Sequence, residues 1–232
     1  MYRNETSTAR RRARALTVEG IVLAAGGSVR FGVDNKLLHV LNGQPIIRLT
    51  VQAYVESLER VIVVIRPDDE PIARALEGLG AEVVSNPLHE LGMSTSLHSG
   101  LAGLRDSTEA TVIGVADQPL LSAGVINVIV EHWLKSRSPI IVPYYAGRPG
   151  NPALYARSLF DGLMAVTGDV GGRPVRDAHD HLRVDVKEWW RGMDVDTGDD
   201  IAGALRYLAA PSFRGDAPIL GELRQGDRDD RG

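Results

Sequence analysis

The sequence Ile-Val-Leu-Ala-Ala-Gly-Gly-Ser-Val-Arg-Phe-Gly, residues 21–32, decides the fold of this chain. Its apolar first part continues a run from Val18 that is long enough for a buried strand and too short for a helix. At Gly26-Gly27-Ser28 the side chains are missing or small, so that backbone N–H groups can approach a ligand closely. Arg30 and Lys36 then place two positive charges within reach of the same loop. The stretch predicts a polyphosphate-binding loop; a glycine turn that only ends a core strand is the alternative.

The loop differs from two common phosphate-binding motifs. No Lys-Ser or Lys-Thr follows the glycines, as the GxxxxGK[ST] loop of ATPases requires. The glycine spacing also differs from GxGxxG, and no helical pattern begins directly after it.

Composition excludes several classes of function. Hydrophobic residues make up 44% and charged residues 24% of the 232 residues, which is ordinary for a globular protein. The absence of cysteine excludes disulfides, thiolate metal sites and a cysteine nucleophile. A net charge of −4 argues against a general nucleic-acid binder. With no apolar run of transmembrane length, we expect a cytoplasmic protein without nucleic-acid or membrane partners.

The two ends of the chain differ in composition from its middle. Residues 1–17 contain the basic run 10–14 and are expected to be a disordered arm, while Glu19 interrupts the apolar region that a twin-arginine export signal would need. Residues 210–232 are rich in Gly, Asp and Arg and are expected to be a flexible tail. One nucleotide-binding domain over 18–209 remains.

Apolar runs typical of strands alternate with helical patterns along this domain, which predicts a mostly parallel α/β sheet wound by right-handed crossovers. Ligands of such sheets bind beyond the carboxyl ends of the strands. The predicted strands cover residues 18–25, 61–65, 81–85, 111–116, 140–144 and 182–186. The predicted helices begin at Pro45, Pro71, Ser94, Leu159 and about Ile201.

Two aspartates are expected at this edge of the sheet. Asp117 directly follows the strand 111–116 and should lie beside the glycine loop. A carboxylate facing a polyphosphate would repel it unless a divalent cation lay between them, so Asp117 is predicted to be a magnesium ligand. Asp194 and Asp196 should point in opposite directions because strand side chains alternate. Thr197 is a suitable N-cap of the last helix, which leaves Asp196 to face the edge.

Two further loops carry polar residues. Gly92 precedes Ser94, Thr95 and Ser96 at the start of a helix, where hydroxyl groups can either cap the helix or contact a ligand. A second glycine-rich loop, residues 168–173, carries Asp169 and one cation.

These pieces, taken in order, resemble the nucleotidyltransferase family whose best-known branch is the molybdenum cofactor cytidylyltransferases. The resemblance covers residues 20–208 and implies a three-layer α/β/α, Rossmann-like fold. It is carried by Leu23–Gly26 with Ser28, Arg30 and Gly32, by Asn35–Leu38, Asn86-Pro87, Gly92–Ser96, Asp117–Pro119, Gly150–Pro152, Gly168-Asp169 and Asp194–Thr197.

The resemblance implies roles for particular residues. Lys36, Arg30 and Asp117 would act in catalysis, and Asp117 and Asp196 would hold Mg²⁺. Arg148, Asn151 and Asp169 would bind the acceptor, although Pro149 stands where the family often has the arginine of an Arg-Gly-Asn-Pro sequence. The nucleotide would contact Leu23, Ala24, Ala25, Gly26, Gly27, Ser28, Lys36, Ser94, Thr95 and Ser96.

The activity implied is transfer of CMP from CTP to the terminal phosphate of molybdopterin, with release of pyrophosphate. Alanine at position 25 is similar to the cytidine-using branch, and glycine there to guanosine users. The expected partners are CTP or GTP, a molybdopterin-type acceptor, and a molybdoenzyme or its maturation factor. The alternatives are another base or acceptor, such as a sugar- or polyol-phosphate, and a non-catalytic nucleotide-binding chaperone that loads the cofactor.

Overall fold

The computed structural model describes residues 17–26, 35–209 and 223–225. The predictions for Gly27, Ser28 and Arg30, for the basic arm up to residue 16, and for residues 210–222 and 226–232 of the tail therefore lie outside the described residues.

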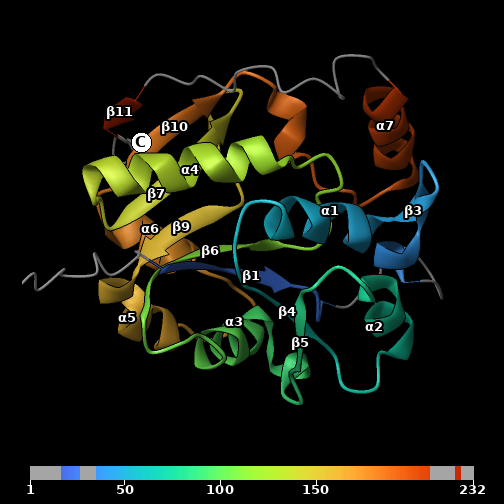
Figure 1. Ribbon diagram of the computed structural model, residues 1–232, viewed down its shortest axis with the longest axis horizontal. Coiled ribbons are helices and arrows are strands. Elements are labelled where there is room, and N and C mark those ends of the chain that lie inside the picture. Colours follow the sequence, from blue (N-terminus) through green and yellow to red (C-terminus); the bar gives the residue numbers. More distant parts are fainter. Residues whose placement is uncertain (1–16, 27–34, 210–222, 226–232) are drawn as a thin grey trace, which may run out of the picture.

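The described residues form a nine-stranded mixed sheet with the strand order β11-β10-β7-β9-β6-β1-β4-β5, and β8 pairs with β7 (Figure 1). The strands β5, β4, β1, β6, β7 and β10 all run in the same direction, whereas β9 lies antiparallel between β6 and β7. The mostly parallel sheet expected from the sequence is thus confirmed. Its strands are β1 (Thr17–Leu23), β4 (Val61–Ile65), β5 (Glu82–Ser85), β6 (Thr108–Val115), β7 (Ile140–Tyr145), β8 (Arg148–Pro149), β9 (Ala153–Ala156), β10 (Leu182–Val186) and β11 (Leu223–Gln225).

Helices cover both faces of the sheet, which gives the three layers that the resemblance implies. In Figure 1, α1 and α4 lie above the sheet and α3 and α5 below it. A small hairpin of β2 (Val40–Leu41) and β3 (Gln44–Pro45) precedes α1. The helices are α1 (Ile46–Val55), α2 (Glu70–Leu76), α3 (Met93–Ala102), α4 (Ala123–Ser136), α5 (Phe160–Met164), α6 (Arg173–Ala178) and α7 (Gly198–Ala209), with 3-10 turns η2 (Lys36–Leu38), η3 (His89–Leu91), η4 (Arg157–Leu159) and η5 (Trp189–Gly192).

The strand β4 shows why its sequence is apolar throughout. Val61, Val63 and Ile65 pack into the core on the side of α1 and α4, and Ile62 and Val64 into the core on the side of α3 and α5. Successive strand side chains point to opposite faces, so a strand covered on both sides needs an uninterrupted apolar run. The same alternation in β1 fixes this strand in the centre of the sheet, with the predicted loop at its carboxyl end.

The observed boundaries of several elements differ from the predicted ones by one to three residues. Pro45 belongs to β3, and α1 begins one residue later. The helix α7 begins at Gly198 rather than at about Ile201, because Thr197 accepts a hydrogen bond from the Asp200 N–H at 3.3 Å and caps it. Ala153–Ala156, outside the predicted strands given above, enter the middle of the sheet as β9, and the ladder begins only after Pro152, which has no N–H to donate.

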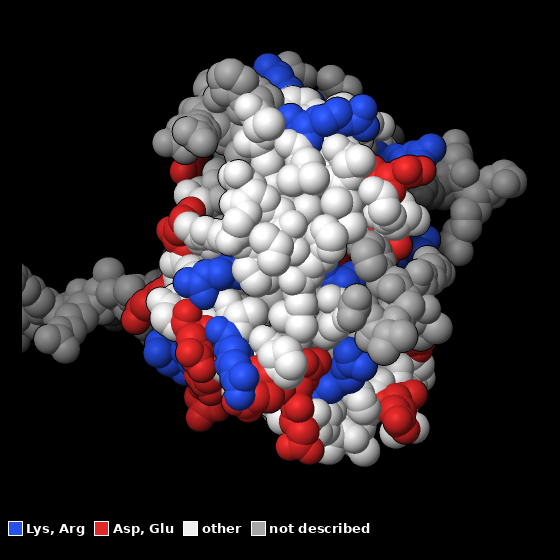
Figure 2. Space-filling model, turned by 90° about the vertical axis from the view of Figure 1, so that its right-hand side faces the viewer, with Lys and Arg blue, Asp and Glu red and all other residues white. Residues whose placement is uncertain are grey.

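One face of the molecule is formed by the elements at the right of Figure 1, among them α7, β3 and α2. Figure 2 shows a broad uncharged area in its middle, with acidic and basic side chains mixed together below it. The exposed apolar residues Val40 and Leu205 belong to β2 and α7. Within the described part of the chain, no helix has both the length and the apolar character to cross a membrane.

A buried acid stabilises the sheet at the opposite end from the predicted site. Glu19 on β1 is fully buried, and its carboxylate accepts hydrogen bonds from Arg60 at 2.8 Å and from the Arg105 N–H at 3.3 Å. Arg60 also pairs with Glu82 of β5 at 2.6 Å. The charge that interrupts the first apolar run is therefore neutralised by arginines that arrive from two other segments.

Replacing Arg60 by methionine should destabilise the protein strongly. Removing one partner of a buried ion pair costs about 3–5 kcal/mol of the free energy of unfolding. Because Arg105 Nε stays 3.5 Å from Glu19 Oε1, the loss should lie at the lower end of this range. Urea denaturation of Arg60→Met beside the wild type measures this loss. The matched control is Arg74→Met, because Arg74 is 70% exposed and pairs with Glu70 on the same helix. The loss in this variant should stay below about 0.5 kcal/mol. Equal losses of unfolding free energy in the two variants would contradict a stabilising role of the buried pair between Glu19 and Arg60.

Candidate active site

The loop after β1 and the loop after β6 lie side by side at one edge of the sheet. The two strands are parallel neighbours, with Leu23 opposite Val115. The Ala116 N–H donates to the Leu23 carbonyl at 3.1 Å, and the hydroxyl of Thr50 on α1 donates to the Ala116 carbonyl at 3.0 Å. The turn at Ala24–Gly26 and Asp117 therefore share one rim, as the sequence predicts.

A third segment joins this rim through the backbone of Asp117. The Val195 N–H donates to the Asp117 carbonyl at 2.9 Å, so that Asp194 and Asp196 extend to opposite sides of this hydrogen bond. Asp200 fixes the segment by accepting from the N–H groups of Asp196 at 3.1 Å and Thr197 at 2.8 Å. Asp196 is the aspartate that reaches Lys36, as expected, but Asp194 lines a cavity together with Asp117, so both acids lie near this edge.

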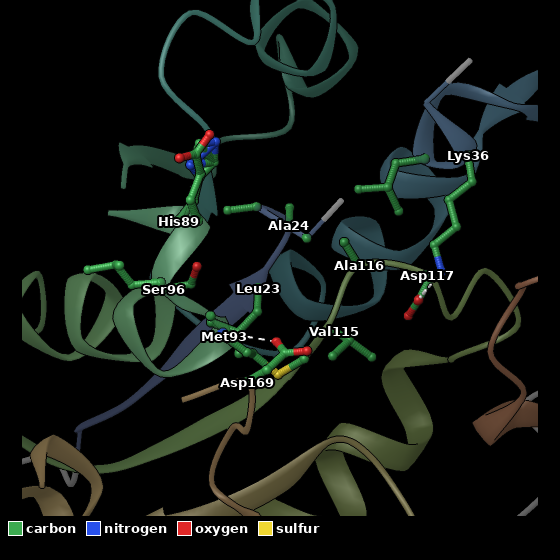
Figure 3. A pocket seen from close by; sticks show the side chains of 16 residues that line it. Leu23, Ala24, Lys36, His89, Met93, Ser96, Val115, Ala116, Asp117 and Asp169 are labelled. Carbon is green, nitrogen blue, oxygen red and sulfur yellow. Dashed lines mark hydrogen bonds and ion pairs between the residues drawn. The ribbon is translucent and has the colours of Figure 1, made fainter. Parts of the chain in front are cut away.

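Lys36 lies between two carboxylates. Its Nζ donates to Asp117 Oδ2 at 2.6 Å and to Asp196 Oδ1 at 2.7 Å. The Asn35 side chain holds the η2 turn by accepting from the Leu37 N–H at 3.1 Å. Partial burial opposes the charged form, but the contacts with Asp117 and Asp196 outweigh it and raise the pKa of Lys36 above its usual value. Figure 3 shows Lys36 reaching down to Asp117 at one side of the cavity.

The two carboxylates leave a coordination position open. Oδ1 of Asp117 is buried and has no hydrogen-bond partner among the described residues. Asp196 is more accessible, with 47% of its side chain exposed. No group of three or more His, Asp or Glu suited to a metal is found in the parts of the chain that the structure describes. The donor set fits a hard cation such as Mg²⁺ that takes one or two carboxylates and completes its shell with water and phosphate oxygens.

The neighbouring carboxylate of Asp194 has a different environment. Although much of this residue is exposed, protein atoms crowd its carboxyl group, which accepts a hydrogen bond from the Gln118 amide at 2.8 Å. Burial of this group and the negative charge of Asp117 raise the pKa of Asp194 to about 6. The edge thus carries three acids whose repulsion Lys36 partly offsets.

A cavity of about 590 Å³ opens beside the turn at Ala24–Gly26. This volume is within the range of small-molecule and cofactor sites. The backbone of the turn, Lys36 and Asp117 form one side of it, and η3 with the start of α3 forms the other (Figure 3). Its lining includes Leu23, Ala24, Ala25, Gly26, Lys36, Ser96, Asp117 and Asp169, which the sequence analysis named, together with His89, Glu90, Leu91 and Met93, which it did not assign.

The three hydroxyl residues of α3 have different environments. Thr95 donates to the Gly92 carbonyl at 2.9 Å and therefore acts within the helix start. Ser94 is buried, and its N–H donates to Gly168 at 3.1 Å. Ser96 lines the cavity, where its hydroxyl accepts from the Asn86 amide at 3.0 Å. Of the two roles left open by the sequence, capping by a hydroxyl is not observed, because Gly92 is the N-cap of α3 and makes no side-chain cap hydrogen bond. Ser96 is the one of the three hydroxyl residues that lines the cavity.

The second glycine-rich loop docks on the start of α3. Gly92 has φ +106°, and a Cβ there would come within 2.6 Å of the Gly168 carbonyl carbon and oxygen, so only glycine fits. Asp169 Oδ1 accepts from the Met93 N–H at 3.2 Å, drawn as a dashed line in Figure 3. A carboxylate is favourable at this position because it faces the positive end of the helix dipole.

A second cavity of about 350 Å³ adjoins the first, and Asp117 and Asp169 line both. Asn151, predicted to bind the acceptor, lines the second cavity as well. Arg148 does not: it lies exposed on β8 and is absent from the lining of either cavity.

Among the described residues that line the second cavity, the cations are Arg173 and Arg176 on α6. Arg173 is the cation predicted for the second glycine-rich loop, whereas Arg176 was not predicted, because no helix was expected at this place. Pro174 at the start of the segment was the available signal, since proline favours the first turn of a helix.

Comparison with known proteins agrees with this geometry. Residues 20–183 match a family described as MobA-like NTP transferase domain. The chain belongs to this family. A MobA-like NTP transferase domain therefore makes up most of the described sheet, and the family assignment from the sequence is confirmed.

Three curated relatives carry the name of a molybdenum cofactor nucleotidyltransferase. Proteins of Thermococcus sibiricus and Pyrococcus horikoshii, each named probable molybdenum cofactor guanylyltransferase, are 30% and 34% identical over 53% and 59% of this chain. The chain spans 60% and 68% of their lengths. The molybdenum cofactor cytidylyltransferase of Escherichia coli is 24% identical over 82% of this chain and 97% of its own length.

Solved structures share the fold. Rv0371c of Mycobacterium tuberculosis H37Rv has a TM-score of 0.70 and 25% identity, covering 83% of this chain and 99% of its own. A second structure of Rv0371c, in complex with manganese, has a TM-score of 0.65 and 24% identity, with 82% and 98% coverage.

Proposed function

We propose that this protein transfers CMP from CTP to the terminal phosphate of molybdopterin and releases pyrophosphate. The observation that carries the proposal is the pair Asp117 and Asp196 around Lys36, placed where the two cavities meet. The first cavity would hold the nucleotide on the backbone of Ala24–Gly26, and the second the acceptor. The names of the relatives support a molybdenum cofactor acceptor.

The reaction needs no protein nucleophile. An oxygen of the acceptor phosphate, already ionised at neutral pH, forms a bond to the α-phosphorus, and the bond from that phosphorus to the bridging oxygen of the β-phosphate breaks. The electron pair leaves with pyrophosphate. The chain's part is to align the two phosphates and to neutralise charge with Lys36, Arg30 and loop N–H groups. Alignment alone can contribute about 7–11 kcal/mol.

Asp117 and Asp196 would hold a divalent cation, and the buried, unpartnered Oδ1 of Asp117 supports this role. When bound at these residues, the cation would supply neutralisation of the charge that develops on the leaving pyrophosphate. The manganese complex of Rv0371c supports a divalent cation in this fold. Lys36 would then leave the carboxylates and contact the triphosphate.

The choice of CTP rests on Ala25. Ala25 lines the first cavity, and a glycine at this position would lack its methyl group. Alanine here is similar to the cytidine-using branch of the family. Guanylyl transfer is the second candidate, since the relatives of Thermococcus sibiricus and Pyrococcus horikoshii are named guanylyltransferases. A chaperone role is disfavoured because a pure binder needs neither Lys36 nor Asp117 to assist pyrophosphate departure.

Pyrophosphate release from CTP or GTP, measured with magnesium and molybdopterin, tests this proposal. CTP should be the faster substrate, and Asp117→Asn should lower kcat/KM by about 100-fold or more, because metal stabilisation of transition-state charge contributes several kcal/mol. Asp199→Asn is the control, since Asp199 is exposed in the first turn of α7. Faster turnover with GTP would overturn the choice of base. Full cofactor-loading activity of Asp117→Asn would favour the chaperone.

Lys36 and a divalent cation would compete for the same carboxylate oxygens, so removing the lysine should improve metal binding in the absence of nucleotide. Lys36→Met should bind Mn²⁺ about 10-fold more tightly than the wild type, because hydrogen bonds to charged groups contribute about 1.5–3 kcal/mol each. Electron paramagnetic resonance of free Mn²⁺ measures this affinity. Lys135→Met, at an exposed lysine of α4, should bind like the wild type. Weaker or unchanged Mn²⁺ binding by Lys36→Met would contradict the competition.

A further inference from the structure

The second cavity has an uneven distribution of charge. Asp117, Asp169 and Asp194 line it, and the first two also line the nucleotide cavity. Arg173 and Arg176 are the cations among its described lining residues. A phosphorylated acceptor that enters this cavity approaches three carboxylates and a triphosphate, so it needs positive charge from elsewhere. Only α6 supplies such charge among the described residues of this cavity.

The two arginines converge on one acid. Arg173 Nε lies 3.6 Å from Asp177 Oδ2, and Arg176 Nη2 lies 2.8 Å from Asp177 Oδ1. One carboxylate therefore faces two guanidinium groups, and the cluster keeps a net positive charge. Arg176 also donates its Nε to the same oxygen at 2.9 Å, so these contacts use one side of its fork and do not involve Nη1.

Packing holds Arg176 in place. Its side chain is 15% exposed, whereas that of Arg173 is 76% exposed. The positive charge of Arg176 lowers the pKa of Tyr155, which burial raises, and so opposes the burial effect on this neighbour in the cavity wall. A partly buried, oriented guanidinium loses less entropy on binding an anion than a free surface side chain.

The loop before α6 brings the arginines to the cavity by a close approach. A Cβ at Gly172 would lie 2.7 Å from the Tyr155 hydroxyl, so the backbone can pass Tyr155 only without a side chain. The same loop carries Asp169, which is anchored on the Met93 N–H at the start of α3. The segment 169–176 thus contributes both Asp169 to the wall of the nucleotide cavity and the two arginines to the second cavity.

We propose that Arg173 and Arg176 form the anion-binding subsite for the phosphate of the acceptor and direct it toward the edge at Asp117. The ligand class is a phosphate monoester attached to a larger organic body. The inference rests on the proposed function and deepens it, since it replaces Arg148 by the α6 pair as the cations that recognise the acceptor.

Calorimetric titration with molybdopterin in the absence of nucleotide tests the subsite in the full-length protein. Arg173→Gln should weaken binding about 10-fold, and Arg173→Gln with Arg176→Gln about 100-fold or more, because each charge-assisted hydrogen bond contributes about 1.5–3 kcal/mol. Replacement of both arginines by lysine should restore part of the affinity, since the charge remains and the planar fork is lost. In steady state, KM for molybdopterin should rise while KM for CTP changes less than about twofold.

Arg74→Gln is the matched control, because Arg74 is as exposed as Arg173 and belongs to α2. Wild-type affinity of both glutamine variants would overturn the subsite and leave the proposed function intact. A rise in KM for CTP equal to that for molybdopterin would also overturn it, since it would indicate a general structural defect. Absence of molybdopterin binding and of pyrophosphate release in the wild type would overturn the proposed function and the subsite together.

Discussion

The site depends on an electrostatic constraint at one edge of the sheet, where the carboxylates of Asp117 and Asp196 both contact the ammonium group of Lys36. Two carboxylates repel each other, and in a partly buried place this repulsion is weakly screened. Lys36 resolves it with contacts of 2.6 and 2.7 Å. The register of β1 against β6 and the hydrogen bond from Val195 to Asp117 impose this geometry. Any positive group that enters the edge must therefore satisfy the same two acids.

The two cavities adjoin at this edge and would bring two substrates to it from different sides. A nucleotide on the backbone of Ala24–Gly26 would present its phosphates to Lys36, and an acceptor in the second cavity would reach the same place from the side of α6. The loop 168–173 connects the two, because Asp169 lines both cavities and Arg173 and Arg176 line the second. Nucleotide and acceptor would thus meet at Asp117, which lines both cavities and is in contact with Lys36.

Much of this arrangement could be predicted because local sequence determines it. The β-branched run 61–65 forms β4 within the same bounds, and the position of Asp117 after a buried strand placed it at the ligand edge. The sequence could not predict that β9 inserts antiparallel between β6 and β7, because strand order depends on contacts between distant segments. For the same reason Arg148 was assigned to the acceptor, whereas the fold leaves it exposed on β8 and brings α6 to the cavity. Arg176 belongs to no recognisable sequence motif, and it lies in the second cavity because α6 carries it there.

The most direct test of the central claim is a crystal structure of the protein with Mn²⁺ and a non-hydrolysable CTP analogue, collected at the manganese absorption edge. The account predicts one anomalous peak in direct coordination with Asp117 and Asp196, with Lys36 Nζ moved from the carboxylates to the phosphates. An anomalous peak away from both aspartates, or a Lys36 that stays between them beside bound nucleotide, would contradict it.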